Sequence, residues 1–128
     1  MSFDWSEYLY LAQENADIRP DKSYSVEAKL RVAISRAYYA AFCQARNYLI
    51  DNSSFVALSD QETHWDIIYK FLHSSDGSRR RIGLELSRLR NSRNQADYDN
   101  VYPNLSLATA QALVNAAQQV IIRLSRLK

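Results

Sequence analysis

Residues 79–97 of the chain read RRRIGLELSRLRNSRNQAD, and the order of apolar and polar side chains in this stretch predicts an α-helix. Its apolar residues follow one another at helical intervals, as Ile82, Leu86, Leu89 and Ala96. This spacing places them on one side of the helix, where they can pack against a core. Arg93 falls inside the same stripe, because eleven residues make almost three turns and bring position 93 to within roughly 20° of position 82.

The same periodicity continues through the rest of the chain, and it nowhere changes to the alternation that is typical of a strand. We expect helices over about residues 4–18, 25–51, 59–76 and 79–97, and a last one from residue 106 onwards. Short connections between long amphipathic helices favour an antiparallel bundle. The sequence therefore predicts a single all-α domain over residues 1–128, folded as an antiparallel bundle of about five helices.

Several details of these helices follow from single positions. Alanines at 33, 37, 40, 41 and 45 would let a neighbouring helix approach the second helix closely, which predicts that it is central. We expect Trp65, Ile68, Tyr69 and Leu72 to form the inward face of the third helix, which Ser59 and Glu62 would begin as a capping box. Ser78 and Ser106 are predicted to cap the last two helices.

The composition excludes several classes of protein. A chain of 128 residues with 47% hydrophobic residues is not a disordered polypeptide, and two glycines cannot build a Gly-rich phosphate loop. One cysteine and two distant histidines form neither an internal disulfide nor a zinc site. No apolar run approaches the ~18 residues of a membrane span, and residues 1–7 do not resemble a signal peptide. We therefore expect a cytoplasmic protein without a cofactor.

Positive charge is concentrated in one helix although the net charge of the chain is only +2. Residues 79–93 contain six arginines and one acid. Arg79, Arg80 and Arg81 stand at the start of this helix, where the helix dipole disfavours cations. The run is either a solvated helix face or the binding surface of an anionic partner, for which nucleic acid is the simplest candidate.

Arg93 breaks the apolar pattern of its helix, and a guanidinium that faces a core is costly unless it is paired. Asp97 lies four residues further on, within side-chain reach on the same face, so an ion pair could close one end of the bundle. Alternatively, Arg93 is held out of water to bind a phosphate or to stabilise a developing oxyanion. Arg90 would then add a second positive charge.

Two segments together resemble HEPN domains (higher eukaryotes and prokaryotes nucleotide-binding). LRNSRNQADYD at 89–99 is similar to their signature helix, and AISRAYYAAF at 33–42 is similar to their long second helix. The resemblance implies a helical bundle that forms a homodimer and cleaves RNA without a metal, by attack of the 2′-OH on the adjacent phosphate. It also implies a role in toxin–antitoxin or defence systems, with a nucleotidyltransferase antitoxin as partner.

The resemblance assigns roles to three residues. Arg93 matches the motif arginine, which would stabilise the charged phosphorane, and Asn94 matches the polar residue that follows it and would orient the phosphate. Tyr98 stands at the nearest position where the family has a histidine, and this helix contains none. An ordinary tyrosine, with a pKa near ~10, is a poor base at neutral pH, although its hydroxyl can donate to a phosphate oxygen.

Three further residues have two interpretations each. His64 is either a surface histidine of the third helix or a base recruited to the site. Tyr39 either packs in the core or lines the cleft beside Arg93. Arg36 is interpreted as a surface residue or as part of an ion pair.

The sequence thus leaves three functions open. The first is an RNA-targeting ribonuclease, either a toxin or a defence component, with Tyr98 in place of the histidine. The second is a non-catalytic relative that binds RNA, a nucleotide or a nucleotidyltransferase partner as a regulatory subunit. The third is a structural helical subunit in which Arg93 and Asp97 form an ion pair.

Overall fold

The computed structural model of the chain describes residues 3–16, 26–52 and 60–127, with the side chains of residues 60–63 left aside. In these residues the protein is all-α, with five helices packed against one another and no strand. The helices are α1 (Ser6–Asn15), α2 (Val26–Asn52), α3 (Asp60–Leu72), α4 (Gly77–Tyr98) and α5 (Leu107–Ser125). The predicted fold class is therefore confirmed.

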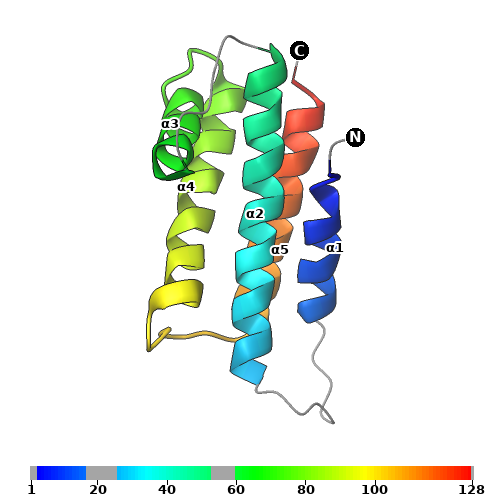
Figure 1. Cartoon of the computed structure of the whole chain (residues 1–128), viewed down its shortest axis with the longest axis vertical. Helices are drawn as coiled ribbons and strands as arrows, with labels where there is room; N and C mark the ends of the chain where they lie inside the picture. Colours follow the sequence, from blue (N-terminus) through cyan, green and yellow to red (C-terminus); the bar gives the residue numbers. More distant parts are fainter. Residues whose placement is uncertain (1–2, 17–25, 53–59, 128) are drawn as a thin grey trace.

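The long helix α2 is the centre of the bundle, as its alanines predict. It packs against α1, α4 and α5, and the alanines at 33, 37, 40, 41 and 45 are fully buried. Figure 1 shows α2 and α5 running in one direction and α1 and α4 in the other. The short helix α3 packs chiefly on α4 and crosses the end of the bundle where α4 begins, so that Figure 1 shows it nearly end-on.

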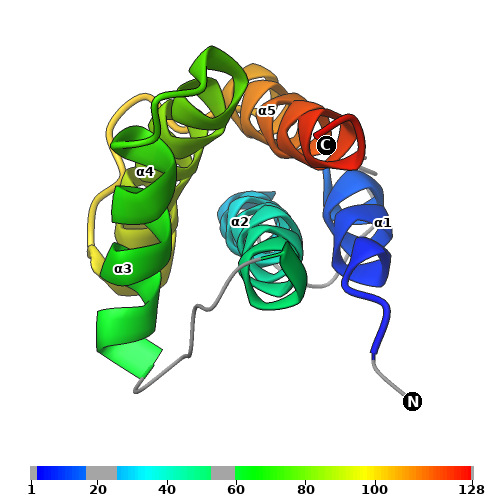
Figure 2. The ribbon, with the colours of Figure 1, turned by 90° about the horizontal axis from the view of Figure 1, so that it is seen from above.

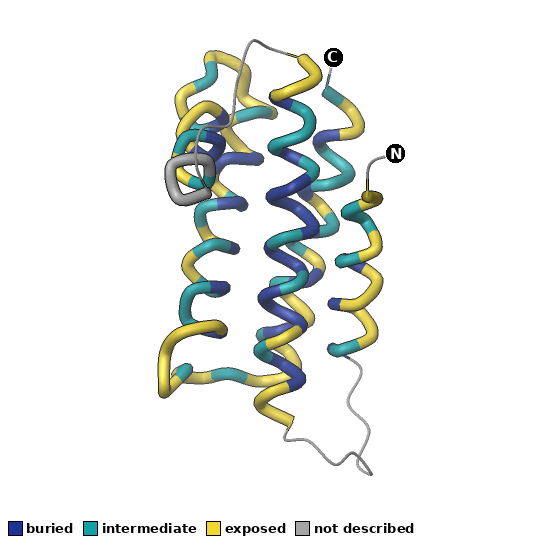
Figure 3. The backbone as a smooth tube through the Cα atoms, in the orientation of Figure 1, coloured by how far each residue is buried: buried dark blue, intermediate teal, exposed yellow. Residues whose placement is uncertain are grey.

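One side of α2 stays uncovered. Seen from above, α1 lies on one flank of α2, α3 and α4 lie on the other, and α5 lies behind it (Figure 2). None of the described helices covers the side of α2 that faces away from α5. Figure 3 nevertheless shows buried residues along most of α2, whereas the outer sides of α3 and α4 are exposed.

The helix α4 begins earlier than the sequence predicts. Its N-cap is Asp76, whose side chain accepts a hydrogen bond from the Arg79 amide at 3.0 Å, so Ser78 is not the cap. At the start of α5 the prediction is confirmed, since the Ser106 hydroxyl accepts from the Thr109 amide at 3.1 Å. The predicted capping box at Ser59 lies outside the described residues.

The inward face of α3 differs from the predicted one. Ile67, Ile68 and Phe71 are buried, whereas Trp65 is 53% and Tyr69 47% exposed. Because α3 packs mainly on one neighbour, α4, only a narrow stripe of its surface enters the core. The two aromatic residues lie beside that stripe and contact each other in solvent, with ring centres 6.0 Å apart.

Candidate functional site

Arg93 is buried in the apolar stripe of α4, as its spacing predicts, with 6% of its surface exposed. Its guanidinium group lies among tyrosine rings from two helices. The guanidinium carbon is 5.1 Å from the ring centre of Tyr38 and 5.3 Å from that of Tyr39, both on α2. Tyr98, at the end of α4, contributes a third ring at 6.0 Å. Such rings stabilise a cation through their π faces, but they accept no conventional hydrogen bond from it.

The guanidinium group of Arg93 has no hydrogen bond within the described part of the chain. Its Nε atom is buried without a partner, and the same holds for Nε of Arg90 one turn earlier. The one carboxylate paired with Arg93 is that of Asp97, whose Oδ2 atom lies 3.9 Å from Nη1, too far for a hydrogen bond. Most buried polar groups in proteins are satisfied, so the unpaired Nε atoms of two neighbouring arginines mark this cluster as the candidate site.

Asp97 is held from the other side by α2. The Ser35 hydroxyl donates a hydrogen bond to Asp97 Oδ2 at 3.2 Å and accepts one from Arg36 Nη2 at 3.0 Å. The carboxylate side chain is 28% exposed, and solvent therefore screens its attraction to Arg93. The predicted ion pair exists, but it is long and satisfies only part of the charge of Arg93.

His64 joins the site from α3. Its Nδ1 atom lies 2.6 Å from the hydroxyl oxygen of Tyr38, and its ring stacks on Phe42 with centres 4.0 Å apart. Burial raises the pKa of Tyr38, an effect that the charges of Arg90 and Arg93 oppose. The phenol therefore keeps its proton at neutral pH, and the tautomer of His64 decides which of the two groups donates the hydrogen bond. His64 contacts the tyrosines that surround Arg93, so it is not an isolated surface histidine.

The remaining sequence candidates lie at different distances from Arg93. Tyr39 contacts it, and Tyr98 is 73% exposed at the rim of the site. Asn94 follows Arg93 on α4 and is half-buried. No hydrogen bond of Asn94 is found among the residues that the structure describes.

Arg79, Arg80 and Arg81 are not brought together with Arg93. They precede it by at least twelve residues, which is about 18 Å along the helix axis. Arg79 donates to the Tyr48 hydroxyl at 2.8 Å, and Arg80 donates to the Ser74 carbonyl at 3.0 Å. Two of the three predicted phosphate ligands are thus engaged in local contacts at the opposite end of α4.

Arg36 is the residue that the sequence interpretation missed. Its guanidinium carbon lies 5.1 Å from the ring centre of Tyr8 on α1 and 5.2 Å from that of Tyr39. The spacing of positions 36 and 39 places both on one face of α2. That face alone could not indicate Tyr8, which reaches it only through the packing of α1.

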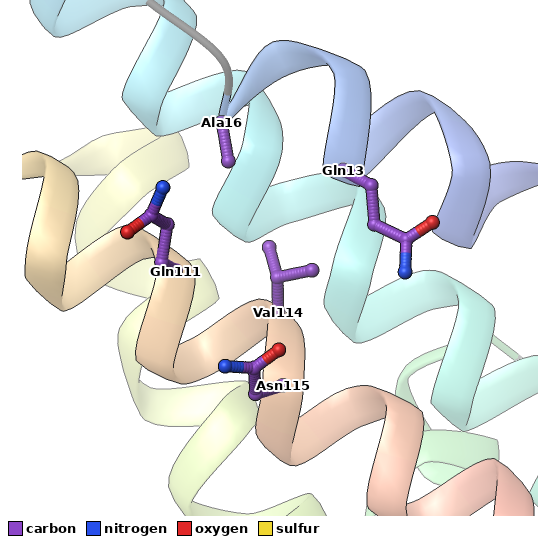
Figure 4. A pocket seen from close by; sticks show the side chains of 5 residues that line it. All are labelled: Gln13, Ala16, Gln111, Val114 and Asn115. Atoms are coloured by element: carbon purple, nitrogen blue, oxygen red, sulfur yellow. The ribbon is translucent and has the colours of Figure 1, made fainter.

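Two pockets elsewhere on the surface contain no part of this site. One pocket, of about 400 Å³, lies between α1 and α5, where Figure 4 shows three amide side chains around Ala16 and Val114. The other lies at the start of α4 and is lined in part by Arg79 and Arg126. In the described residues no three His, Cys, Asp or Glu side chains gather as a metal site would require, and no helix is long and apolar enough to span a membrane.

No protein-family model matches the sequence. The chain is 33% identical over 109 residues to the uncharacterized protein MJ0628 of Methanocaldococcus jannaschii. The match covers 76% of this chain and 64% of that protein, so the chain spans less than two thirds of its relative. The name of the relative carries no statement of function, and what the comparison supports is a distant homologue.

Proposed function

We propose that the protein is an HEPN-type protein that binds RNA through Arg90 and Arg93 and cleaves it without a metal. The observation that carries the proposal is the buried guanidinium of Arg93, which has no hydrogen bond within the described residues. A phosphodiester fits this site because a planar guanidinium can bind two of its oxygens at once, and Arg90 adds a second positive charge.

The chemistry follows from where charge develops. The 2′-oxygen attacks the adjacent phosphorus, the bond to the 5′-oxygen breaks, and the products are a 2′,3′-cyclic phosphate and a free 5′-hydroxyl. Negative charge builds on the non-bridging oxygens, where a positively charged donor held in a dry site has its largest effect. This is the role of Arg93.

Two groups could move the protons. A base must take the proton of the 2′-hydroxyl, and an acid must protonate the leaving 5′-oxygen. Tyr98 is exposed beside Arg93 and replaces the histidine of the family motif. The Nδ1 atom of His64 is hydrogen-bonded to the Tyr38 hydroxyl, so this nitrogen would act on RNA only through that phenol.

A second candidate function is binding without cleavage. The absence of a histidine from α4 and the carboxylate of Asp97 beside Arg93 favour it. The protein would then bind RNA or a nucleotide, or serve as the regulatory partner of a nucleotidyltransferase. A homodimer would bring two copies of the site together in either case.

The test is incubation of the purified protein with mixed-sequence RNA in EDTA. Arg93→Gln and Tyr98→Phe are the test variants. Arg88→Gln is the matched control, because it removes an exposed arginine of α4 whose partner among the described residues is Glu85. We expect the wild type and the control to leave 2′,3′-cyclic phosphate ends and Arg93→Gln to leave none. Binding without cleavage, lost in Arg93→Gln, would support the second function. Absence of any RNA binding would refute RNA cleavage and the RNA-binding form of the second function.

A further inference from the structure

Arginine and tyrosine side chains alternate in a connected series that joins α1, α2 and α4. Arg36 lies between the rings of Tyr8 and Tyr39, at 5.1 and 5.2 Å, and Tyr39 in turn contacts Arg93 at 5.3 Å. The series ends at the exposed ring of Tyr98. We call these five residues the Tyr–Arg strip. It joins residues of α1, α2 and α4.

The strip continues on the α1 side. The Trp5 ring contacts Tyr8, with centres 5.2 Å apart, and the guanidinium carbon of Arg46 lies 5.6 Å from the Trp5 ring centre. Three arginines, Arg36, Arg46 and Arg93, therefore lie along one connected series of side chains. Within the described residues, Arg93 is the one of these three arginines that is paired with an acid, and that acid is Asp97.

Arg36 is prepared to hold an anion. An arginine has five N–H donors, and Arg36 uses one of them, toward the neighbouring Ser35 hydroxyl. Contacts with two rings restrict the guanidinium, so less freedom is lost when a ligand binds. Unlike Arg93, Arg36 is only half-buried, and no other hydrogen bond of its side chain is found within the described residues.

The spacing of the two arginines suits a polynucleotide. The guanidinium carbons of Arg36 and Arg93 lie 5.2 and 5.3 Å from the centre of the Tyr39 ring. The two carbons are therefore no further apart than the sum of these distances. Neighbouring phosphates of one strand can reach across such an interval. Single strands also expose base faces that stack on aromatic rings, which a duplex does not offer, and Tyr98 is 73% exposed.

We propose that Arg36, fixed between Tyr8 and Tyr39, is a second phosphate subsite, and that the Tyr–Arg strip binds single-stranded RNA over more than one nucleotide. This inference rests on the proposed function, since it takes Arg93 as the first subsite. It adds that the RNA is single-stranded and that the strand runs toward α1. It also adds Arg36 as a phosphate contact that the sequence did not indicate.

The test measures binding of a fluorescently labelled single-stranded RNA of eight nucleotides, with uridine 3′-monophosphate as the competitor. The variants are Arg36→Gln, Arg36→Lys and Arg93→Gln, and Arg88→Gln is the control. We expect Arg36→Gln to weaken binding of the eight-nucleotide RNA about tenfold and to lower the slope of log affinity against log salt by about one. Affinity for the monophosphate should stay at the wild-type value, because Arg93 and Arg90 hold it without Arg36. Arg36→Lys should restore the salt slope.

The outcomes separate this inference from the proposed function. If Arg93→Gln binds both ligands like the wild type, the proposed function fails. If Arg93→Gln loses both but Arg36→Gln binds the RNA like the Arg88 control, only the second subsite fails. Sedimentation measures the oligomeric state of every variant. If Arg36→Gln changes that state, and its RNA affinity equals that of the wild type in the same state, the Tyr–Arg strip is an interface between copies of the chain. The inference is then overturned.

Discussion

Replacing Arg93 by methionine should remove function and leave the fold intact. The guanidinium is buried and makes no hydrogen bond within the described residues, and an unsatisfied buried donor costs about 1–3 kcal/mol. Loss of the contacts with the tyrosine rings opposes this gain by up to about 2 kcal/mol. The long, partly exposed pair with Asp97 contributes no more than about 1 kcal/mol. Methionine fills the same space without a charge, so we expect a free energy of unfolding within about 1 kcal/mol of the wild type.

The comparison variant is Arg31→Met, which removes an arginine whose guanidinium group makes several hydrogen bonds. Arg31 Nη1 donates to three carbonyl oxygens at the end of α4, those of Gln95, Ala96 and Asp99, at 2.7–3.1 Å. These contacts satisfy carbonyls that a helix end otherwise leaves open. We expect Arg31→Met to destabilise the protein by about 2 kcal/mol, since hydrogen bonds to a charged group contribute about 1.5–3 kcal/mol.

Urea unfolding followed by circular dichroism measures both variants. The midpoint of Arg93→Met should stay near that of the wild type, and the midpoint of Arg31→Met should fall, with the slope unchanged in each. RNA binding should be lost in Arg93→Met and retained in Arg31→Met at temperatures where both are folded. A loss of more than about 3 kcal/mol in Arg93→Met would show that the arginine braces the bundle and would refute the reasoning from its missing partner.

Three further predictions concern other positions. Gly83→Ala should destabilise the protein by about 2 kcal/mol in thermal unfolding, because an added Cβ would lie 2.6 Å from the Leu72 backbone nitrogen. Gly77→Ala is the control and should not destabilise the protein, because its Cβ would meet the end of a flexible side chain at 3.5 Å. Asp97→Asn should raise phosphate affinity about fivefold in a competition assay, because it removes the carboxylate that shares Arg93, and unchanged affinity would mean that the carboxylate does not compete. Burial raises the pKa of the Cys43 thiol from 9.0 to about 11, so the unfolded chain loses this proton at a lower pH than the folded protein. Between pH 9 and 11 the free energy of unfolding should therefore fall more steeply in the wild type than in Cys43→Ala. Equal slopes would contradict a buried, protonated thiol.

The sequence predicts the part of the site that lies on one helix. The position of Arg93 in the apolar stripe of α4 follows from helical geometry alone, and its burial confirms it. The same geometry gives Asp97 as a neighbour, and the structure shows the pair at 3.9 Å. Both results depend only on local spacing, which a helix fixes without reference to the rest of the fold.

The contacts between side chains of different helices could not be predicted from the sequence. The contact of His64 with Tyr38 requires α3 to cross the end of the bundle, and Arg36 meets Tyr8 only because α1 packs beside α2. The exposed position of Trp65 has the same origin. A helix with apolar residues around more than half of its circumference does not indicate which part a single neighbour will cover.

The placement of the unpaired arginine nitrogens is more informative than their number. A surface arginine satisfies its donors with water, so an empty donor there indicates nothing. The Nε atoms of Arg93 and Arg90 differ, because both are buried and have no hydrogen-bond partner among the described residues. Replacement of such groups by apolar side chains would lose little stability, and stability alone therefore does not explain why the chain carries them. A site that must bind an anion needs donors already in place and free of other partners, since every internal hydrogen bond would have to break before the ligand could bind. The tyrosine rings fit the anion site that we propose, because they contact the guanidinium without accepting a conventional hydrogen bond from it.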